Sequence, residues 1–278
     1  MAADRAFQSR AVAIGEDPLE AGKRELKEET GATGRDYQFL GNLYPSPGYC
    51  DEIIRDGKTD MAFFRPGTGE WYVLRSNDFT FYSFPFGNGT DVTVPADYDG
   101  DGKADAAVFR PSNSTWYIFR STDNGTTITT FGAAGDKPVP ADYDGDNKAD
   151  IAIYRPSVGE WWLNRSTDGV IAAAFGSSTD KLVQGDYTGD GKADLAFFRP
   201  ASNEWFVLRT SDFSFYSFVY GSAGDVAAPG DYDGDGRFDA SVFRPSTNTW
   251  FLNRTTAGVQ ITSFGAAGDR SVPGTYVW

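Results

Sequence analysis

From about residue 55 onward, short runs of β-branched and aromatic residues alternate with clusters of Gly, Asn, Asp and Ser. One stretch contains four such runs, at residues 104–110, 115–120, 126–131 and 137–143. Runs of this length, bounded by turn-forming residues, are typical of short β-strands. Stretches that favour helix are absent from this part of the sequence. The pattern therefore predicts an all-β segment.

The four-run pattern recurs with a nearly constant period. An Arg-Pro pair, a Trp six residues after its Arg and a second Arg four residues after the Trp recur at intervals of 45, 45, 44 and 45 residues. An aromatic-Gly pair follows in every unit. Four short strands in about 45 residues are typical of one blade of a β-propeller. The arginines of the Arg-Pro pairs are Arg65, Arg110, Arg155, Arg199 and Arg244, and the tryptophans are Trp71, Trp116, Trp161, Trp205 and Trp250.

The sequence therefore predicts a five-bladed β-propeller of four-stranded blades over residues 55–278. Residues 271–278 repeat the segment that precedes the Asp-rich loop in the other units, whereas the first unit starts after that segment, at Asp56. We expect this C-terminal strand to complete the first blade and close the ring, because closure leaves no open sheet edge. Residues 1–54 differ in composition and are expected to be an incomplete, separate segment.

Each unit carries an Asp-rich loop between its first and second strands. Carboxylates occupy loop positions 1, 3, 5 and 9. Crowded like charges cost energy unless a cation compensates them, and hard oxygen ligands suit Ca²⁺. Gly at position 6 permits the turn, and Asn147 can replace it because Asn tolerates the left-handed conformation. With the position-7 carbonyl as a backbone ligand, the predicted calcium ligands are Asp97, Asp99, Asp101, Lys103 and Asp105; Asp142, Asp144, Asp146, Lys148 and Asp150; Asp186, Thr188, Asp190, Lys192 and Asp194; and Asp231, Asp233, Asp235, Arg237 and Asp239.

The loops are not equivalent. Thr188 stands at position 3 of its loop, where the others have Asp, so we expect weaker binding there. Asp56 and Asp60 belong to an incomplete first loop and form at best a weaker site. About four Ca²⁺ would change the formal net charge from −14 to −6. The alternative is that these are metal-free Asp/Gly turns, but turn chemistry alone does not need Asp at every liganding offset.

Composition excludes several classes of function. The chain contains no His and one Cys, so it has no Ser-His-Asp triad, Cys-His pair, His-ligated zinc or disulfide framework. A net charge of −14 argues against binding to nucleic acid or anionic membranes. The longest apolar run has about six residues, far below the ~18 needed for a membrane span. We expect a monomer.

The repeated units read D-Y-D-G-D-G-K-A-D-x-A-x-F-R-P, followed by x-W-x-x-x-R-S and F-G-x-x-G-D, and they resemble the FG-GAP/VCBS-type repeats of calcium-binding β-propellers. The resemblance implies a non-enzymatic binding or adhesion scaffold whose ligand, protein or carbohydrate, is unknown. It suggests an extracellular or cell-surface location, although residues 1–10 lack the apolar core of a secretory signal peptide. We expect the repeated arginines to be structural and to pair with the Asp of the G-x-x-D step, at Asp91, Asp136, Asp180, Asp225 and Asp269.

The segment before residue 55 predicts one helix, at about residues 18–30. Asp17 suits an N-cap, Pro18 the first turn and Gly31 the C-terminal stop. Around this helix the sequence reads Glu16-x7-Arg24-Glu25-Leu26-x-Glu28-Glu29-x-Gly31-Ala32. This motif resembles the later part of the Nudix box of ADP-ribose pyrophosphatases. The resemblance implies that Glu25, Glu28 and Glu29 would hold Mg²⁺ and that Arg24 would brace the box. The activity that the resemblance implies is Mg²⁺-dependent hydrolysis of ADP-ribose or related nucleoside diphosphate sugars.

The Nudix resemblance is incomplete. Arg10 stands where the box expects Gly, and 54 residues are too few for the mixed sheet that a Nudix fold needs. We therefore expect this alternative function to be inactive. The abrupt change of pattern near residue 55 predicts a fusion of two unrelated pieces, either natural, engineered or an assembly error.

Overall fold

The computed structural model describes residues 38–39, 61–75, 80–266, 268–269 and 271. The chain divides into two units, Met1–Tyr37 and Gln38–Trp278, and every described residue belongs to the second. The predicted helix and the Nudix-like residues Arg24, Glu25, Glu28 and Glu29 thus lie outside the described residues, as do Asp56 and Asp60. Within the described ranges, no helix has the length and apolarity needed to cross a bilayer.

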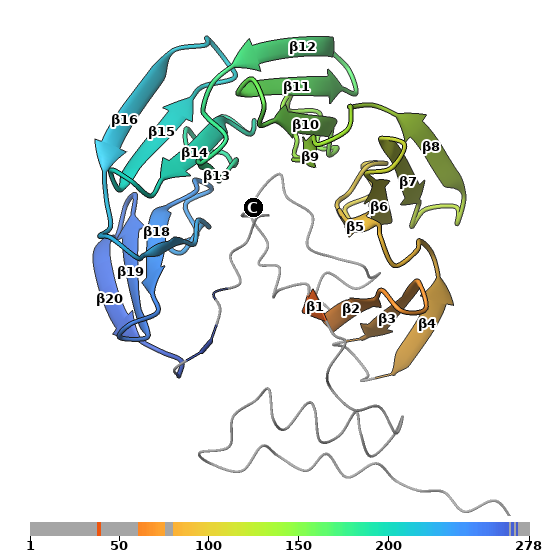
Figure 1. Cartoon of the computed structure of the whole chain (residues 1–278), viewed down its shortest axis with the longest axis horizontal. Coiled ribbons are helices and arrows are strands. Elements are labelled where there is room, and N and C mark those ends of the chain that lie inside the picture. Colours follow the sequence, from red (N-terminus) through yellow and green to blue (C-terminus); the bar gives the residue numbers. More distant parts are fainter. Residues whose placement is uncertain (1–37, 40–60, 76–79, 267, 270, 272–278) are drawn as a thin grey trace, which may run out of the picture. The chain divides into compact units, whose positions relative to one another are not determined.

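Five four-stranded antiparallel sheets follow one another along the chain and surround a common centre (Figure 1), which confirms the predicted five-bladed propeller. Blade 1 contains β1 (Gln38–Phe39), β2 (Met61–Arg65), β3 (Glu70–Leu74) and β4 (Phe81–Pro85), and blade 2 contains β5 (Val92–Thr93), β6 (Ala106–Arg110), β7 (Thr115–Phe119) and β8 (Thr126–Thr130). Blade 3 contains β9 (Lys137–Pro138), β10 (Ile151–Arg155), β11 (Glu160–Arg165) and β12 (Gly169–Ala174). Blade 4 contains β13 (Lys181–Leu182), β14 (Leu195–Arg199), β15 (Glu204–Leu208) and β16 (Phe215–Val219), and blade 5 contains β17 (Val226–Ala227), β18 (Ala240–Arg244), β19 (Thr249–Arg254) and β20 (Gly258–Ser263).

The repeated Trp and the aromatic-Gly pair are parts of one local structure. Trp161 pairs across the sheet with Tyr154 on one side and Ala173 on the other. Its indole N–H donates a 2.7 Å hydrogen bond to the carbonyl of Phe175, the aromatic residue before Gly176. The tryptophans of all five blades make the same bond, with N···O distances from 2.7 to 3.2 Å. This bond explains why the two sequence markers share one period, because a buried indole needs an acceptor.

Hydrophobic cores lie at the joints between consecutive blades. Each of four buried clusters combines the Trp-bearing face of one blade with the facing side of the next, from the joint of blades 1 and 2 to that of blades 4 and 5. The tryptophans of blades 1 to 4 are completely buried, whereas Trp250 in blade 5 is only partly buried and Phe264 is 72% exposed. Among the described residues, therefore, the Trp face of blade 5 has no equivalent covering blade.

The inner strand of blade 1 differs from our expectation. Gln38–Phe39 pairs with β2, with Gln38 opposite Phe64 as Val92 is opposite Phe109 in blade 2. We expected residues 271–278 in this place, and residues 272–278 lie outside the described residues. The innermost strand of a blade pairs with its neighbour through only two residues, and the pairing uses backbone atoms. The repeat pattern of side chains therefore does not specify which segment forms this strand in blade 1.

The predicted pairing of the Arg-Pro arginines is confirmed in four blades. Arg110, for example, donates from Nε and from one terminal nitrogen to the two carboxylate oxygens of Asp91, both at 2.8 Å. The four aspartates have almost no exposed side-chain surface. The other pairs are Arg155 with Asp136, Arg199 with Asp180 and Arg244 with Asp225.

Within the described ranges, the second set of arginines does not bind these aspartates. Arg120 instead pairs with Asp123, three residues later, and Arg165 and Arg254 donate to backbone carbonyls of the turn that follows them. These arginines stand at the end of the third strand, so the nearest acceptors belong to the next hairpin. Asp269, the fifth aspartate of the set, is exposed and has no Arg partner among the described residues.

Candidate metal centres in the aspartate loops

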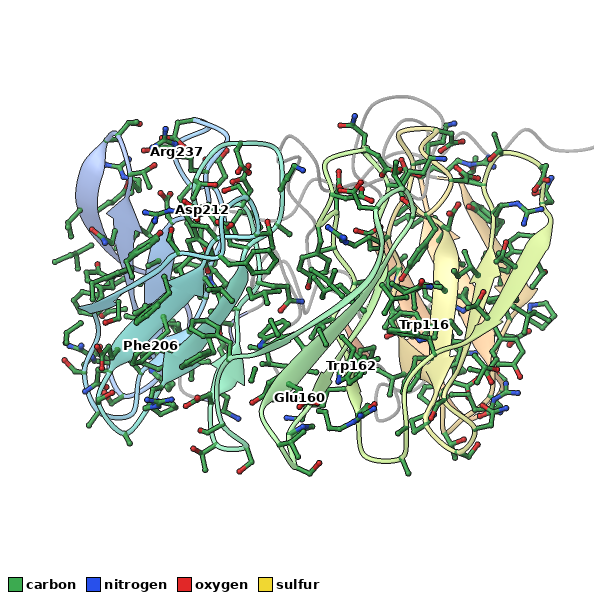
Figure 2. All side chains as sticks on the ribbon, turned by 90° about the horizontal axis from the view of Figure 1, so that it is seen from above. Trp116, Glu160, Trp162, Phe206, Asp212 and Arg237 are labelled. Carbon is green, nitrogen blue, oxygen red and sulfur yellow. The ribbon has the colours of Figure 1, made fainter. Side chains whose placement is uncertain are left out.

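The carboxylate at position 1 shapes each Asp loop. Asp97 accepts hydrogen bonds from the backbone N–H of Gly100 at 2.6 Å and of Gly102 at 2.9 Å, one on each oxygen. Asp142, Asp186 and Asp231 bind the same two positions of their own loops. The loop therefore curls around its first carboxylate, which brings the later side chains close to it. Arg237, in the Asp loop of blade 5, and Glu160, at the start of β11 in blade 3, lie at opposite ends of the blades (Figure 2).

The sharp turn of the loop requires a left-handed backbone at position 6. Gly102 has a φ of 80° and Asn147 a φ of 63°. Asn is among the few residues other than Gly that adopt this conformation readily. The predicted equivalence of Asn147 and Gly at this position is confirmed.

The Asp at position 9 fastens the loop to the blade. Asp150 accepts the backbone N–H of Tyr143 at 2.9 Å on one oxygen and that of Ser166 at 2.7 Å on the other. Asp105, Asp194 and Asp239 bind the matching pairs of N–H groups. Ser166 belongs to the hairpin between the third and fourth strands, so position 9 connects the loop to that hairpin. Its predicted role as a metal ligand stays a prediction.

The hairpin also contributes hydroxyl groups that the sequence reasoning did not identify. In blade 3, Ser166 and Thr167 donate from their hydroxyls to Oδ2 of Asp146, at 2.5 and 2.6 Å, and the N–H of Thr167 donates to Asp144. Matching donors in the hairpins of blades 2 and 5 are Ser121, Thr122, Thr255 and Thr256. The signal was available, because a Ser/Thr pair follows the second repeated Arg in each of these units.

In three of the four complete loops the structure brings three of the predicted carboxylates together, and Asp105, Asp150 and Asp235 are not in these groups. Carboxylate oxygens lie within 4.8 Å of one another in three groups: Asp97, Asp99 and Asp101; Asp142, Asp144 and Asp146; and Asp231, Asp233 and Asp239. Among the described residues, the loop with Thr188 has no such group, in keeping with its missing carboxylate. No donor from the described residues binds the buried oxygens Oδ1 of Asp144 and Oδ1 of Asp233. Two buried anionic oxygens without a donor are what a cation would compensate.

The position-7 residues are arranged differently from simple ligands. The N–H of Lys103 donates to Asp101 Oδ1 at 2.9 Å, and its ammonium binds the other oxygen of Asp101 at 2.8 Å. The side chains of Lys148, Lys192 and Arg237 lie against the Gly at position 4 of the preceding loop. Coordination by the carbonyls of these residues stays a prediction.

Loops of consecutive blades are bonded to each other. The N–H at position 8 of one loop donates to the carbonyl at position 1 of the preceding loop, for Ala149 to Asp97, Ala193 to Asp142 and Phe238 to Asp186, each at 2.6 Å. The residue that shapes one candidate site thus also anchors the next loop. The loops form a connected series rather than four independent turns.

Metal-free protein should lose stability as the pH rises from 5 to 8. Burial raises the pKa of Asp105, Asp150 and Asp194 to about 7 and that of Asp239 to about 6, and neighbouring loop carboxylates add to the effect. The unfolded value is about 3.9. The folded state therefore binds these protons more tightly than the unfolded state does. The protons' contribution to the free energy of unfolding is fully present below pH ~4 and is lost as the pH rises through about 6 to 7. Asp101 and Asp146, whose pKa is lowered, titrate below this window.

Urea denaturation of chelator-treated protein at pH 5 and at pH 8 measures this effect. The midpoint should be lower at pH 8. With Ca²⁺ present the trend should reverse, because protons compete with the cation for the carboxylates. Chelated protein that is equally stable or more stable at pH 8 would contradict the prediction.

Of three comparisons with known proteins, one matches the repeats by sequence. The sequence profile of the FG-GAP-like repeat matches residues 53–108, 97–153 and 186–242, which together are more than half of the chain. No curated protein sequence matches the chain.

Solved structures with the same fold have very different sequences. Virginiamycin B lyase from Staphylococcus aureus has a TM-score of 0.53 and 9% identity, with 83% of this chain and 74% of that chain covered. A lectin from Agrocybe aegerita that recognises non-reducing terminal N-acetylglucosamine has a TM-score of 0.54 and 17% identity, with 84% and 67% covered. At these identities the similarity shows the fold alone.

Proposed function

The chain belongs to the FG-GAP-like repeat family, and from this premise we propose that it is a non-enzymatic binding scaffold whose blades are stabilised by Ca²⁺ in the Asp loops. One observation carries the proposal. Three loops each gather three carboxylates within 4.8 Å, and two of these loops bury an oxygen, on Asp144 and on Asp233, that no donor of the described part of the chain binds.

Calcium suits these loops better than magnesium. Ca²⁺ accepts six to eight oxygen ligands at 2.3–2.6 Å with flexible geometry, whereas Mg²⁺ requires a nearly ideal octahedron and keeps several waters. Asp144 and Asp146 each use one oxygen to accept hydrogen bonds from the hairpin. The position-9 Asp and the position-7 carbonyl would complete a mixed oxygen shell. The Thr188 loop would bind more weakly because it lacks one carboxylate.

The binding role is proposed over catalysis because the repeated acids already have partners. The three glutamates that precede the repeated Trp accept hydrogen bonds within their own sheets: Glu70 from Tyr72, Glu160 from Trp162 and Glu204 from Ser217. Among the similar structures, a lyase variant with one histidine replaced by alanine is described as catalytically inactive. This chain contains no histidine, so it does not share that feature.

The proposed ligand is a protein or a carbohydrate, and the proposed location is outside the cell. Extracellular calcium modules bind at about 10⁻⁴ to 10⁻³ M, which matches a calcium-rich compartment. If the Asp loops bind Ca²⁺ only outside the cell, the scaffold would become rigid in the compartment where it binds its ligand.

Calcium-binding stoichiometry tests the proposal. Calorimetric titration of chelator-treated protein should show about three tighter sites and one weaker site. Thr188→Asp restores the missing carboxylate and should raise the affinity of the weaker site by roughly tenfold, that is about 1.4 kcal/mol. Thr179→Asp adds the same charge at an exposed turn outside the loops and is the matched control. Absence of calcium binding, or equal effects of the two variants, would overturn the proposal.

A further inference from the structure

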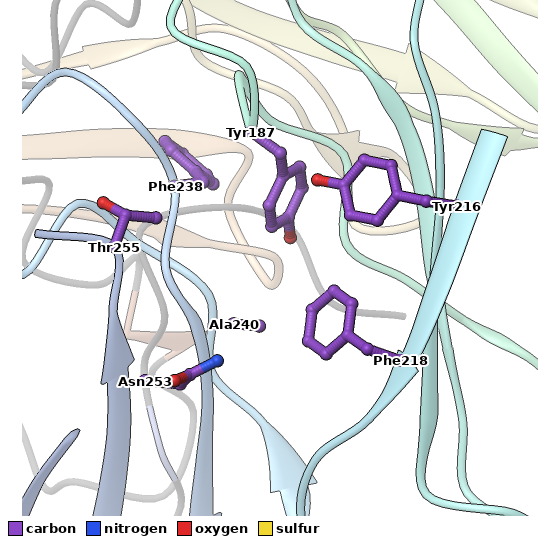
Figure 3. A pocket seen from close by; sticks show the side chains of 7 residues that line it. All are labelled: Tyr187, Tyr216, Phe218, Phe238, Ala240, Asn253 and Thr255. Atoms are coloured by element: carbon purple, nitrogen blue, oxygen red, sulfur yellow. The ribbon is translucent and has the colours of Figure 1, made fainter. Parts of the chain in front are cut away.

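A cavity of about 230 Å³ lies at the joint between blades 4 and 5 (Figure 3). Four aromatic side chains line it: Tyr187, Tyr216 and Phe218 from blade 4, and Phe238 from blade 5. Blade 5 completes the wall with Ala240, Asn253 and Thr255. Aromatic side chains from both blades thus line the cavity together with polar groups.

Comparison with the joint of blades 1 and 2 shows why this space exists. Tyr82 and Phe84 of blade 1 occupy the strand positions of Tyr216 and Phe218. There, Phe119 of blade 2 fills the opposite position, with its ring centroid 5.5 Å from that of Phe84. In blade 5 the position of Phe119 belongs to Asn253, which pairs with Ala240 as Phe119 pairs with Ala106. A short amide in place of a phenyl ring leaves the space open.

Two polar groups face this space without a partner. Among the described residues, neither the hydroxyl of Tyr216 nor the side-chain amide of Asn253 makes a hydrogen bond to another residue. Figure 3 shows the Asn253 amide directed toward the cavity beside Ala240 and the Tyr216 hydroxyl directed toward the ring of Tyr187. The hydroxyl of Thr255 donates to Asp235 at 2.6 Å, so its oxygen can still accept. A ligand here would find an amide and hydroxyl groups as hydrogen-bonding partners and aromatic side chains as apolar walls.

The surroundings favour an uncharged ligand. The Asp loop of blade 5 adjoins the cavity through Thr255 and disfavours an anion. The guanidinium of Arg209 already lies over the ring of Tyr216, 4.8 Å from its centroid, which disfavours a second cation there. The volume is below the ~300–1,000 Å³ of pockets for drug-sized molecules, so the cavity accommodates a single ring.

We propose that this cavity binds one pyranose ring of a carbohydrate. A pyranose has an apolar C–H face that packs on aromatic rings and hydroxyls that exchange hydrogen bonds with an amide and a phenol. The proposal rests on the binding role proposed above and names its ligand class.

Saturation-transfer NMR with the full-length, Ca²⁺-loaded protein tests the proposal. The probes are glucose, galactose, mannose and N-acetylglucosamine, each at up to about 20 mM. At least one should bind with a Kd in about the millimolar range. Asn253→Phe fills the cavity as Phe119 does in the first joint, and it should weaken binding by more than about tenfold. Tyr216→Phe removes only the hydroxyl and should weaken binding about threefold or more.

Asn164→Phe is the matched control. Asn164 holds the same strand position at the joint of blades 2 and 3, where Thr127 and Thr129 replace the aromatic pair, so binding should not change. No transfer to any pyranose, or unchanged binding in both Asn253→Phe and Tyr216→Phe, overturns the proposal. If Asn253→Phe lowers the midpoint of thermal unfolding, the effect of Tyr216→Phe on pyranose binding decides whether the cavity is the binding site. Calcium binding without pyranose binding would reject this inference alone, because calorimetry with Ca²⁺ tests the scaffold separately.

Discussion

Addition of about 10 mM Ca²⁺ to chelator-treated protein should raise the midpoint of thermal unfolding by roughly 15 to 30 °C. A ligand that binds only the folded state stabilises it by about 2.7 kcal/mol per site when its free concentration is 100-fold above Kd, here about 10⁻⁴ M. Three loops have clustered carboxylates, which amounts to about 8 kcal/mol. In a domain of this size each kcal/mol shifts the midpoint by about 2 to 4 °C.

Differential scanning calorimetry measures the shift, with Mg²⁺ as the competing cation. Mg²⁺ should produce a much smaller shift. Asp144→Asn removes a charge from the blade 3 cluster and should remove about a third of the calcium effect. Asp168→Asn, an exposed residue in the adjacent hairpin, changes the net charge equally and should leave the calcium effect intact. A shift below about 5 °C, or equal shifts with both cations, would mean that hydrogen bonds alone hold the loops.

Asp91→Ala should lower the free energy of unfolding by about 3 kcal/mol. Removal of one partner from a buried ion pair costs about 3–5 kcal/mol, because the remaining charge is left uncompensated. The Asp91 carboxylate has no exposed surface, and it binds both the Arg110 guanidinium and the N–H of Asn88. About a quarter of the Arg110 side chain is exposed, which places the cost at the lower end of that range.

Asp269→Ala is the matched comparison. Asp269 accepts the N–H of Ala266 as Asp91 accepts that of Asn88, but it is exposed and has no Arg partner among the described residues. Its loss should change the free energy of unfolding by less than about 0.5 kcal/mol. Urea denaturation monitored by tryptophan fluorescence measures both variants. Equal costs would show that the ion pair adds nothing beyond the turn that the Asp closes.

The repeat pattern predicted the blades well because strand formation in a blade is largely local. Arg155 and Glu160 are five residues apart and pair across one turn, so the strands of a blade are set by short stretches of sequence. The Asp loops were equally readable, since the carboxylate at position 1 binds N–H groups only three and five residues away. The pairing of the Arg-Pro arginines was predictable because the same 19-residue separation recurs in four units.

Contacts between separate segments were harder to predict. The Ser and Thr donors of the hairpins lie about 20 residues from the carboxylates they bind, as Ser166 does from Asp146. The joint of blades 4 and 5 is a clearer case. A Cβ on Gly185 would clash with the ring of Phe238, so the small residue of one blade accommodates the large residue of the next. These two residues are 53 positions apart, and neither is unusual by itself.

The sequence by itself determined the number of blades, the strands within them, the identity of the Asp loops and the conformation that Asn147 shares with Gly. All of these follow from hydrogen bonds and side-chain alternation within one repeat, where the period supplies the distance. The tertiary structure decided what occupies the inner position of blade 1, which aspartates lie close enough to share a cation, and where a joint leaves space for a ligand. Those features depend on how one blade packs against the next. This packing depends on the volume and shape of side chains that lie far apart in the sequence, and the pattern within one repeat does not show which of them meet.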